Sequence, residues 1–205
     1  MIEFLAHRGF WKLSEEKNTF ESLKSALNSG FGIETDLRDL NGQLVISHDV
    51  PTHGVLTCEE FLSYYKHGGY SSTLALNIKS DGLQELIKGL VKKLDIKTAV
   101  FFDMSVPDTL GYRDLMMPFL IRISEYERVN SLIEHSSGVW VDELEVEWVT
   151  KSAWQKILSI HQNIYIVSPE LHGRDHSKLW AQLHELHTEN KQSNFYLCTD
   201  FPDKA

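Results

Sequence analysis

The sequence predicts one α/β domain over residues 1–205 with the fold of a (β/α)8 TIM barrel. Apolar runs of strand length alternate with amphipathic helical segments along the chain, which is typical of a parallel sheet with right-handed crossovers. Eight such strand–helix units fit within the 205 residues, the number that closes a barrel. The alternative, an open doubly wound sheet, is disfavoured because no glycine-rich nucleotide loop follows the first strand.

The first half of the chain contains four predicted strands and one inserted hairpin strand. The apolar run at 2–6 is the first strand, and Thr19 begins a helix that Gly30 ends. Asn41-Gly42 is a hairpin signal between the second strand and the insertion. The further predicted elements are strands at 32–39, 42–49, 73–80 and 99–105, and helices at 57–68, 81–95 and 107–115.

The second half repeats the same alternation. Each apolar run is short and rich in β-branched or aromatic residues, and an amphipathic segment follows it. The predicted strands are 118–124, 138–144, 163–168 and 194–200, and the predicted helices are 125–136, 150–161 and 177–190.

Composition narrows the classes of function. The net charge is −9, from 29 acidic and 20 basic residues, which disfavours nucleic acid as the main partner and leaves a small molecule as the expected one. Cys58 and Cys198 form no disulfide framework, which favours a reducing compartment. The N-terminus lacks a basic secretory region, and no apolar run reaches the roughly 18 residues of a membrane span. We therefore expect a cytoplasmic protein without a membrane span.

Polar residues gather at the carboxyl ends of the predicted strands, where barrel enzymes carry their active sites. Glu34 and Asp36 are two residues apart on one strand, so their carboxylates share a face, and Asn77 and Lys79 repeat that spacing. The candidate residues of the early strands are His7, Arg8, Glu34, Asp36, His48, Asn77 and Lys79. Later strands contribute Asp103, Asp142, Glu143 and Asp200.

Each residue taken singly has a structural alternative. A lone histidine at a strand end is more often a rim residue, and Glu34 and Asp36 are equally compatible with an ion pair to Arg8 or Lys79. Their coincidence on one rim favours a site. Same-face carboxylates suit a hard cation such as Mg²⁺ or Ca²⁺, histidines suit acid–base roles, and arginine with lysine suits phosphate.

Six short motifs occur in a specific order: "HRG" at 7–9, "NTFES" at 18–22, "ETD" at 34–36, "SHD" at 47–49, "NIK" at 77–79 and "TDFP" at 199–202. With them the chain resembles the glycerophosphodiester phosphodiesterases, in the superfamily that includes the phosphatidylinositol-specific phospholipases C. The resemblance implies a (β/α)8 barrel that cleaves a phosphodiester at a glycerol-type alcohol. It also implies three sets of site residues: His7 and His48 as the acid–base pair, Glu34 and Asp36 as ligands of a divalent cation, and Arg8 and Lys79 as phosphate ligands.

The chain departs from the family at Asn77, where the family usually has a third metal-binding glutamate. The amide of Asn77 offers a neutral oxygen, so we include it as a ligand and expect weaker binding unless Asp103, Glu143 or Glu170 compensates. The chain is also short for the family. The segment "SPELHGR" at 168–174 differs from the usual sequence, and its Arg174 is a candidate substrate-binding residue.

Three functional hypotheses follow. The first is a metal-dependent phosphodiesterase in which the two histidines move protons. The second is a barrel that binds a phosphate ligand with weakened or lost catalysis. The third is a metal-independent lyase that forms a cyclic phosphate, against which Glu34 and Asp36 count. The residues leave open the alcohol released, Mg²⁺ versus Ca²⁺, and which histidine is the acid.

Overall fold

The computed structural model describes residues 2–205, which form two compact units. We call Ala6–Phe119 the N-terminal unit, and Leu120–Ala205 with the residues up to Leu5 the C-terminal unit. The first strand, β1 (Ile2–His7), belongs to both. The order of strands in the sheet is β5-β4-β2-β1-β9-β8-β7-β6, and β3 pairs with β2. That the chain is a single domain stays a prediction.

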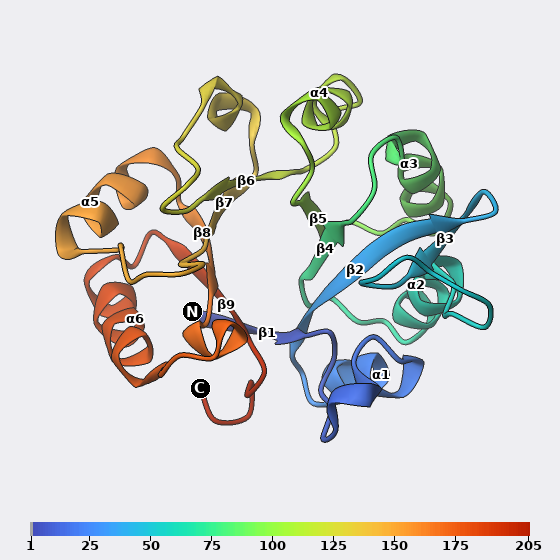
Figure 1. Cartoon of the computed structure of the whole chain (residues 1–205), viewed down its shortest axis with the longest axis horizontal. Coiled ribbons are helices and arrows are strands. Elements are labelled where there is room, and N and C mark those ends of the chain that lie inside the picture. Colours follow the sequence, from blue (N-terminus) through green and yellow to red (C-terminus); the bar gives the residue numbers. More distant parts are fainter. Residues whose placement is uncertain (1) are drawn as a thin grey trace. The chain divides into compact units, whose positions relative to one another are not determined.

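The N-terminal unit has its helices packed outside a short parallel sheet. β2 pairs in parallel with β4, and β4 with β5, while β3 is antiparallel to β2. The other strands of the unit are β2 (Gly32–Leu40), β3 (Gln43–Ile46), β4 (Leu74–Ile78) and β5 (Ala99–Phe102). Its helices are α1 (Phe20–Asn28), α2 (Cys58–His67), α3 (Gln84–Lys93) and α4 (Val106–Asp114). Figure 1 shows these elements in blue to green.

Local signals fix the ends of these elements. The hydroxyl of Thr19 accepts the N–H of Ser22 and so caps α1, and Thr57 caps α2 in the same way through Glu60. The hairpin between β2 and β3 turns at Asn41 and at the following glycine, with φ values of 52° and 79°. Positive φ at both positions matches the right-handed twist of the flanking strands.

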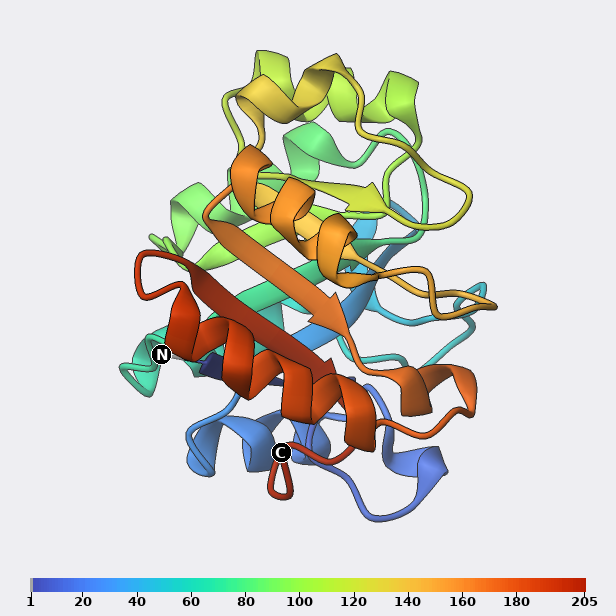
Figure 2. The same cartoon turned by 90° about the vertical axis from the view of Figure 1, so that its left-hand side faces the viewer.

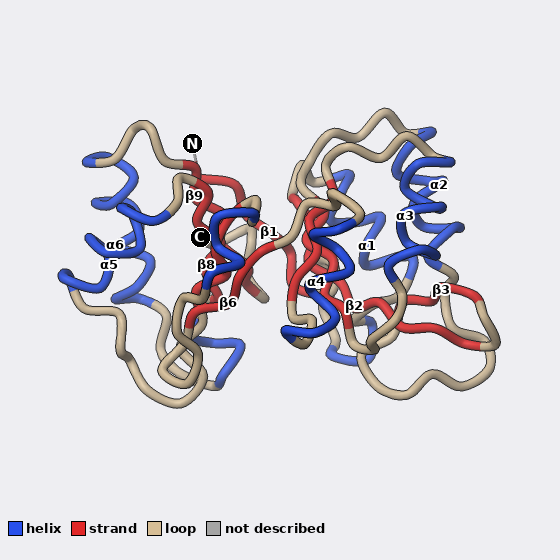
Figure 3. Tube along the Cα trace, turned by 90° about the horizontal axis from the view of Figure 1, so that it is seen from above, coloured by secondary structure: helices blue, strands red, loops and turns tan. Residues whose placement is uncertain are grey.

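The C-terminal unit is also a layer of parallel strands covered by helices. Its strands are β6 (Leu120–Ile123), β7 (Gly138–Val141), β8 (Asn163–Val167) and β9 (Asn194–Thr199). Its helices are α5 (Lys151–Ile160) and α6 (Ser177–Glu189), which Figure 2 shows in orange and red against β8 and β9. Seen from above, strands and helices form separate layers within each unit (Figure 3).

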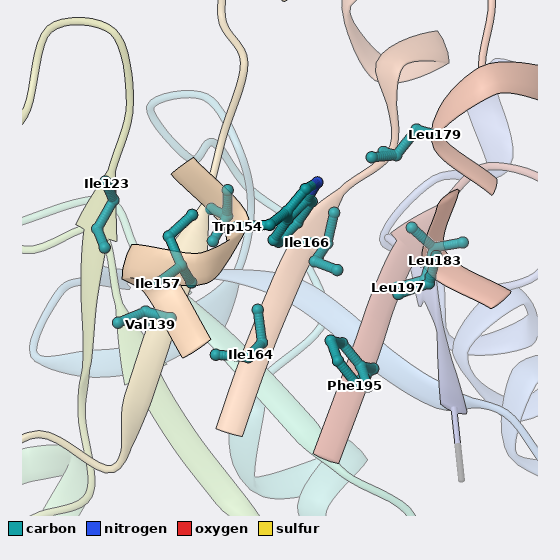
Figure 4. Close-up of a cluster of buried hydrophobic side chains, with 11 residues drawn as sticks. Ile123, Val139, Trp154, Ile157, Ile164, Ile166, Leu179, Leu183, Phe195 and Leu197 are labelled. Atoms are coloured by element: carbon teal, nitrogen blue, oxygen red, sulfur yellow. The ribbon is translucent and has the colours of Figure 1, made fainter. Parts of the chain in front are cut away.

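The two faces of the C-terminal sheet carry different side chains. Aliphatic residues such as Val139, Ile164 and Ile166 pack under Trp154 and Leu183 of the helices (Figure 4). The opposite face has one register row that runs through four strands: Arg122, Trp140, Tyr165 and Tyr196. The tyrosine rings of this row stack 4.1 Å apart, so aromatic rings fill this layer where barrels more often have branched aliphatic side chains.

The helix predicted at 125–136 is the one element that is wrong in type. Only Ser131–His135 is helical, as a short 3₁₀ turn. Preceding residues are held by side-chain contacts instead: the carboxylate of Glu125 accepts the backbone N–H groups of Leu144, Glu145 and Val146, and Glu127 pairs with Arg122. These longer-range bonds compete with the local helix. Within residues 2–205 no helix has the length and hydrophobicity to span a membrane.

Candidate functional site

The chain turns sharply after β1 and fixes the backbone of Arg8. Arg8 has a φ of 58°, its N–H donates to the carbonyl of Glu34 at 2.8 Å, and its carbonyl accepts the N–H of Asn18 at 2.9 Å. Gly9 follows with a φ of 96°, and a Cβ there would lie 2.5 Å from the hydroxyl of Ser22 on α1. Only glycine fits at position 9, because its φ is positive and a side chain would clash with α1. This turn ends the buried strand at "HRG" and places Arg8 beside β2.

Asp36 is the centre of the charged residues in the N-terminal unit. Its side chain is fully buried, with Oδ2 2.9 Å from Nε of Arg8 and Oδ1 3.5 Å from Nζ of Lys79. Asn18 donates to Oδ2 at 2.8 Å. Parallel pairing sets Asp36 opposite Asn77, so Lys79 comes from the neighbouring strand end. These are the ion pairs expected under the alternative to a metal site.

Glu34 is a buried carboxyl in the same place. Burial, and next the charge of Asp36, raise the pKa of Glu34 to about 8, against the opposing effects of Arg8, Lys79 and a hydrogen bond from Asn77. Its Oε2 lies 4.0 Å from Nε2 of His7. Burial and the neighbouring carboxylate thus favour the protonated form of Glu34, in spite of the two cations nearby.

Three buried oxygen atoms bear on whether a cation would fit beside Glu34 and Asp36. Oε2 of Glu34, Oδ1 of Asp36 and Oδ1 of Asn77 are all buried without a hydrogen-bond partner. Buried oxygens without donors are costly, and hard divalent cations bind such oxygens. Over residues 2–205 no group of three or more His, Cys, Asp or Glu side chains is arranged to hold a metal ion. Two carboxylates and one amide are donor types that a hard cation accepts, with one charged ligand fewer than three carboxylates would supply.

Asp103 and His48 complete the predicted residues of this unit. Asp103 follows β5 with a φ of 73°, and its Oδ2 lies 3.2 Å from Nζ of Lys79, so this substitute carboxylate is paired with the lysine. His48 lies in the loop after β3 with its side chain 45% exposed and Nδ1 2.8 Å from Asp49. Its backbone carbonyl accepts a hydrogen bond from Arg38 on β2, which anchors the loop.

The other predicted residues belong to the C-terminal unit and have partners of their own. Glu143 accepts the N–H of Val149 at 2.9 Å. Glu170 accepts the hydroxyl of Thr199 and the N–H of Asp200. Arg174 donates through Nη2 to the carbonyl of Glu143. Glu143 and Glu170 thus each accept local hydrogen bonds, and their role as substitutes for the missing carboxylate stays a prediction.

Sequence reasoning missed the role of Asn18. This residue has a φ of 60°, donates to Asp36 and accepts the hydroxyl of Thr35 at 2.7 Å. It therefore connects the loop before α1 to two adjacent residues of β2. The signal was present, since Asn18 begins the "NTFES" motif, but the motif indicated a helix start and gave the amide no partner.

Comparisons with known proteins find likeness at the level of structure. No family model and no curated protein matches the sequence. A protein of Galdieria sulphuraria assigned as a glycerophosphodiester phosphodiesterase aligns with a TM-score of 0.78 at 16% identity, over 99% of this chain and 95% of that one. The glycerophosphodiester phosphodiesterase of Agrobacterium tumefaciens aligns at 0.73 and 14%, over 99% and 98%. A phosphodiesterase of Oleispira antarctica, in complex with the product sn-glycerol-3-phosphate, aligns at 0.70 and 16%, over 98% and 94%.

This likeness confirms the predicted fold class, a (β/α)8 TIM barrel. The particular barrel that the chain resembles is that of the glycerophosphodiester phosphodiesterases, as its motifs indicate. Identities of 14–16% establish the fold, and the chemistry has to be argued from the residues of this chain.

Proposed function

We propose that the chain is a metal-dependent phosphodiesterase that cleaves a glycerophosphodiester-like substrate. The observation that carries the proposal is the cluster around Asp36, where two cations meet buried oxygens that have no hydrogen-bond donor. The likeness to two glycerophosphodiester phosphodiesterase folds, and to a phosphodiesterase that holds sn-glycerol-3-phosphate, supports the same substrate class.

Glu34, Asp36 and Asn77 would hold a divalent cation, Mg²⁺ or Ca²⁺, through oxygen atoms. When bound, such an ion offsets negative charge on the phosphate and makes phosphorus more open to attack. Asp36 and Glu34 contribute the charge, and Asn77 contributes a dipole. The raised pKa of Glu34 favours a proton on this carboxyl, and a bound cation would take the place of that proton.

Arg8 and Lys79 would bind the phosphate oxygens. Both are already drawn to one buried carboxylate, so their charged groups are held close together before a substrate arrives. The guanidinium of Arg8 matches two phosphate oxygens in one plane, whereas Lys79 acts as a point charge. Asp103 on the other side of Lys79 limits how far the ammonium moves.

His7 and His48 would transfer the protons. One removes the proton of the attacking water or hydroxyl, and the other donates a proton to the leaving alcohol. Trp11 donates to the backbone carbonyl of His7 at 2.9 Å, which steadies the strand end that carries the imidazole. The exposure of His48 gives its ring access to solvent.

We also propose a cytoplasmic location and a small-molecule partner.

A second candidate is a barrel that binds a phosphate ligand without turnover. It is favoured by one observation, the pairing of Asp36 with both Arg8 and Lys79, which satisfies charges that a catalytic metal would otherwise engage.

A panel of phosphodiesters, assayed with EDTA and with each metal, tests these candidates. Metal-restored release of glycerol 3-phosphate from a glycerophosphodiester supports the first proposal. Binding of phosphate without product supports the second candidate, and a cyclic phosphate formed in EDTA supports the lyase.

A further inference from the structure

A histidine–carboxylate pair lies at the strand ends of the C-terminal unit. Asp142 directly follows β7, and His172 ends a 3₁₀ helix (Pro169–His172) that follows β8. Nε2 of His172 lies 2.8 Å from Oδ1 of Asp142, whose side chain is 8% exposed. Trp148 donates to the carbonyl of Asp142 at 2.8 Å and holds that strand end. A buried carboxylate on Nε2 orients the ring and leaves Nδ1 as the nitrogen for another partner.

Arg174 comes two residues after His172, in a turn closed by backbone hydrogen bonds. Gly173 has a φ of 72°, and its N–H donates to the carbonyl of Glu170. The backbone N–H of Arg174 donates to the carbonyl of Pro169 at 3.1 Å. Nη2 of Arg174 reaches the carbonyl of Glu143, whereas Nε and Nη1 are buried with no hydrogen-bond partner. A permanently charged group with two buried donors unused lacks an acceptor.

The nearby carboxylates do not supply that acceptor. Asp142 is engaged with His172, and Glu143 accepts the backbone N–H of Val149. Glu170 accepts from Thr199 and Asp200. The one acceptor that the guanidinium reaches, the main-chain carbonyl of Glu143, is neutral, so no carboxylate accepts a hydrogen bond from it.

We propose that Arg174 and His172 form a second anion site, which binds the phosphate or carboxylate group of a small molecule. The unused donors Nε and Nη1 lie on different edges of the planar guanidinium, so either one donates to an oxygen of such a group while the delocalised charge attracts it. The imidazole of His172, when protonated, donates from Nδ1 to another oxygen. The site uses no residue of the metal and phosphate cluster in the N-terminal unit.

Phosphate binding to the full chain tests this site. All variants are made in a chain that already carries Arg8→Gln and Lys79→Gln, which we call the background. These two changes remove the cations of the N-terminal cluster, so the measurement does not depend on whether that cluster binds phosphate. We expect inorganic phosphate, followed by calorimetry, to bind this background at one site. Arg174→Gln should weaken that binding by about tenfold or more, and Arg174→Lys should weaken it less because the charge is kept. Acetate in place of phosphate separates a carboxylate preference from a phosphate preference.

Arg128→Gln is the matched control, since Arg128 is an exposed arginine of the same unit. A second readout is the ring proton signal of His172, assigned with His172→Asn. It should shift on addition of phosphate, while the signal of the exposed His184 on α6 should not. Equal phosphate affinity in the Arg174→Gln and Arg128→Gln variants, both folded by circular dichroism, overturns the site. So does a background that binds neither phosphate nor acetate.

Discussion

The strand ends of the two units carry similar acidic residues, but the carboxylates differ in how fully their oxygens are hydrogen-bonded. In the C-terminal unit the acidic side chains of Asp142, Glu143 and Glu170 accept hydrogen bonds from nearby protein groups. In the N-terminal unit Glu34 and Asp36 also accept hydrogen bonds, from Asn77 and Asn18, but each keeps one buried oxygen without a hydrogen-bond donor, and both lie among charged side chains. A carboxylate at a strand end is therefore a candidate ligand only when the protein leaves one of its oxygens unsatisfied.

The largest expected effect is on turnover, and it concerns the histidines of the N-terminal unit. We expect His7→Ala and His48→Ala each to lower turnover by about 10²- to 10⁴-fold, the range for loss of a positioned acid or base. Thermal unfolding should change little in either variant. The control is His184→Ala, an exposed histidine of the C-terminal unit, and near-native turnover in either test variant would remove that residue from the mechanism.

Neutralising Asp36 comes next. Asp36→Asn leaves Arg8 and Lys79 without their shared anion, so we expect the folded variant to lose about 3 kcal/mol of unfolding free energy, as measured in urea. Divalent metal affinity, measured by calorimetry, should fall by about tenfold or more because a charged ligand is lost. Asp39→Asn, at an exposed position of the same strand, should change neither quantity. An unchanged metal affinity in Asp36→Asn would favour the ion pair without a metal.

Asn77 tests the metal site directly, because it supplies a neutral amide where a third carboxylate would supply a negative charge. Asn77→Glu or Asn77→Asp should tighten metal binding by about tenfold, or roughly 1.4 kcal/mol. The glutamate has the longer reach and should show the larger change. Glu143→Gln and Glu170→Gln should leave metal affinity unaltered, since both carboxylates are used locally. If neither Asn77 variant binds metal more tightly, Asn77 is not beside the ion, and Asp103 is the next position to change.

The smallest expected effect lies in the C-terminal unit at Glu125. Partial burial alone would raise the pKa of this carboxyl, but backbone hydrogen bonds from Glu145, Leu144 and Val146 hold it at about 2, below the ordinary value of 4.5. The ionised carboxylate therefore stabilises the fold above about pH 4.5, and that contribution is lost as pH falls towards 2.

Glu125→Gln should lower the unfolding free energy by about 1 kcal/mol at pH 6, because solvent weakens these bonds. At pH 2 the variant and the parent chain should have nearly equal stability. Chemical denaturation at both pH values measures this, and a difference that is constant with pH would show that the carboxylate is not ionised by these contacts. Glu134→Gln, on an exposed glutamate of the same unit, is the control.

Local sequence signals determined nearly every element. Thr19 and Thr57 cap their helices, and Asn41-Gly42 turns the hairpin. These outcomes depend on a few adjacent residues whose backbone preferences do not need the rest of the chain. The failure at 125–136 shows the limit, because Glu125 bonds with backbone groups about twenty residues away instead of supporting a helix.

By itself, the sequence determined which residues gather at the strand ends, since period-two spacing puts Glu34 and Asp36 on one face and the strand order follows the chain. Only the tertiary structure decided which of these charges are neutralised and by what. Parallel register brings Lys79 to Asp36, and the turn at Gly9 brings Arg8 to the same carboxylate. Asn18 donates a hydrogen bond to it from the loop before α1. Electrostatic pairing depends on distances of a few ångströms between segments far apart in sequence, and no local pattern specifies those distances.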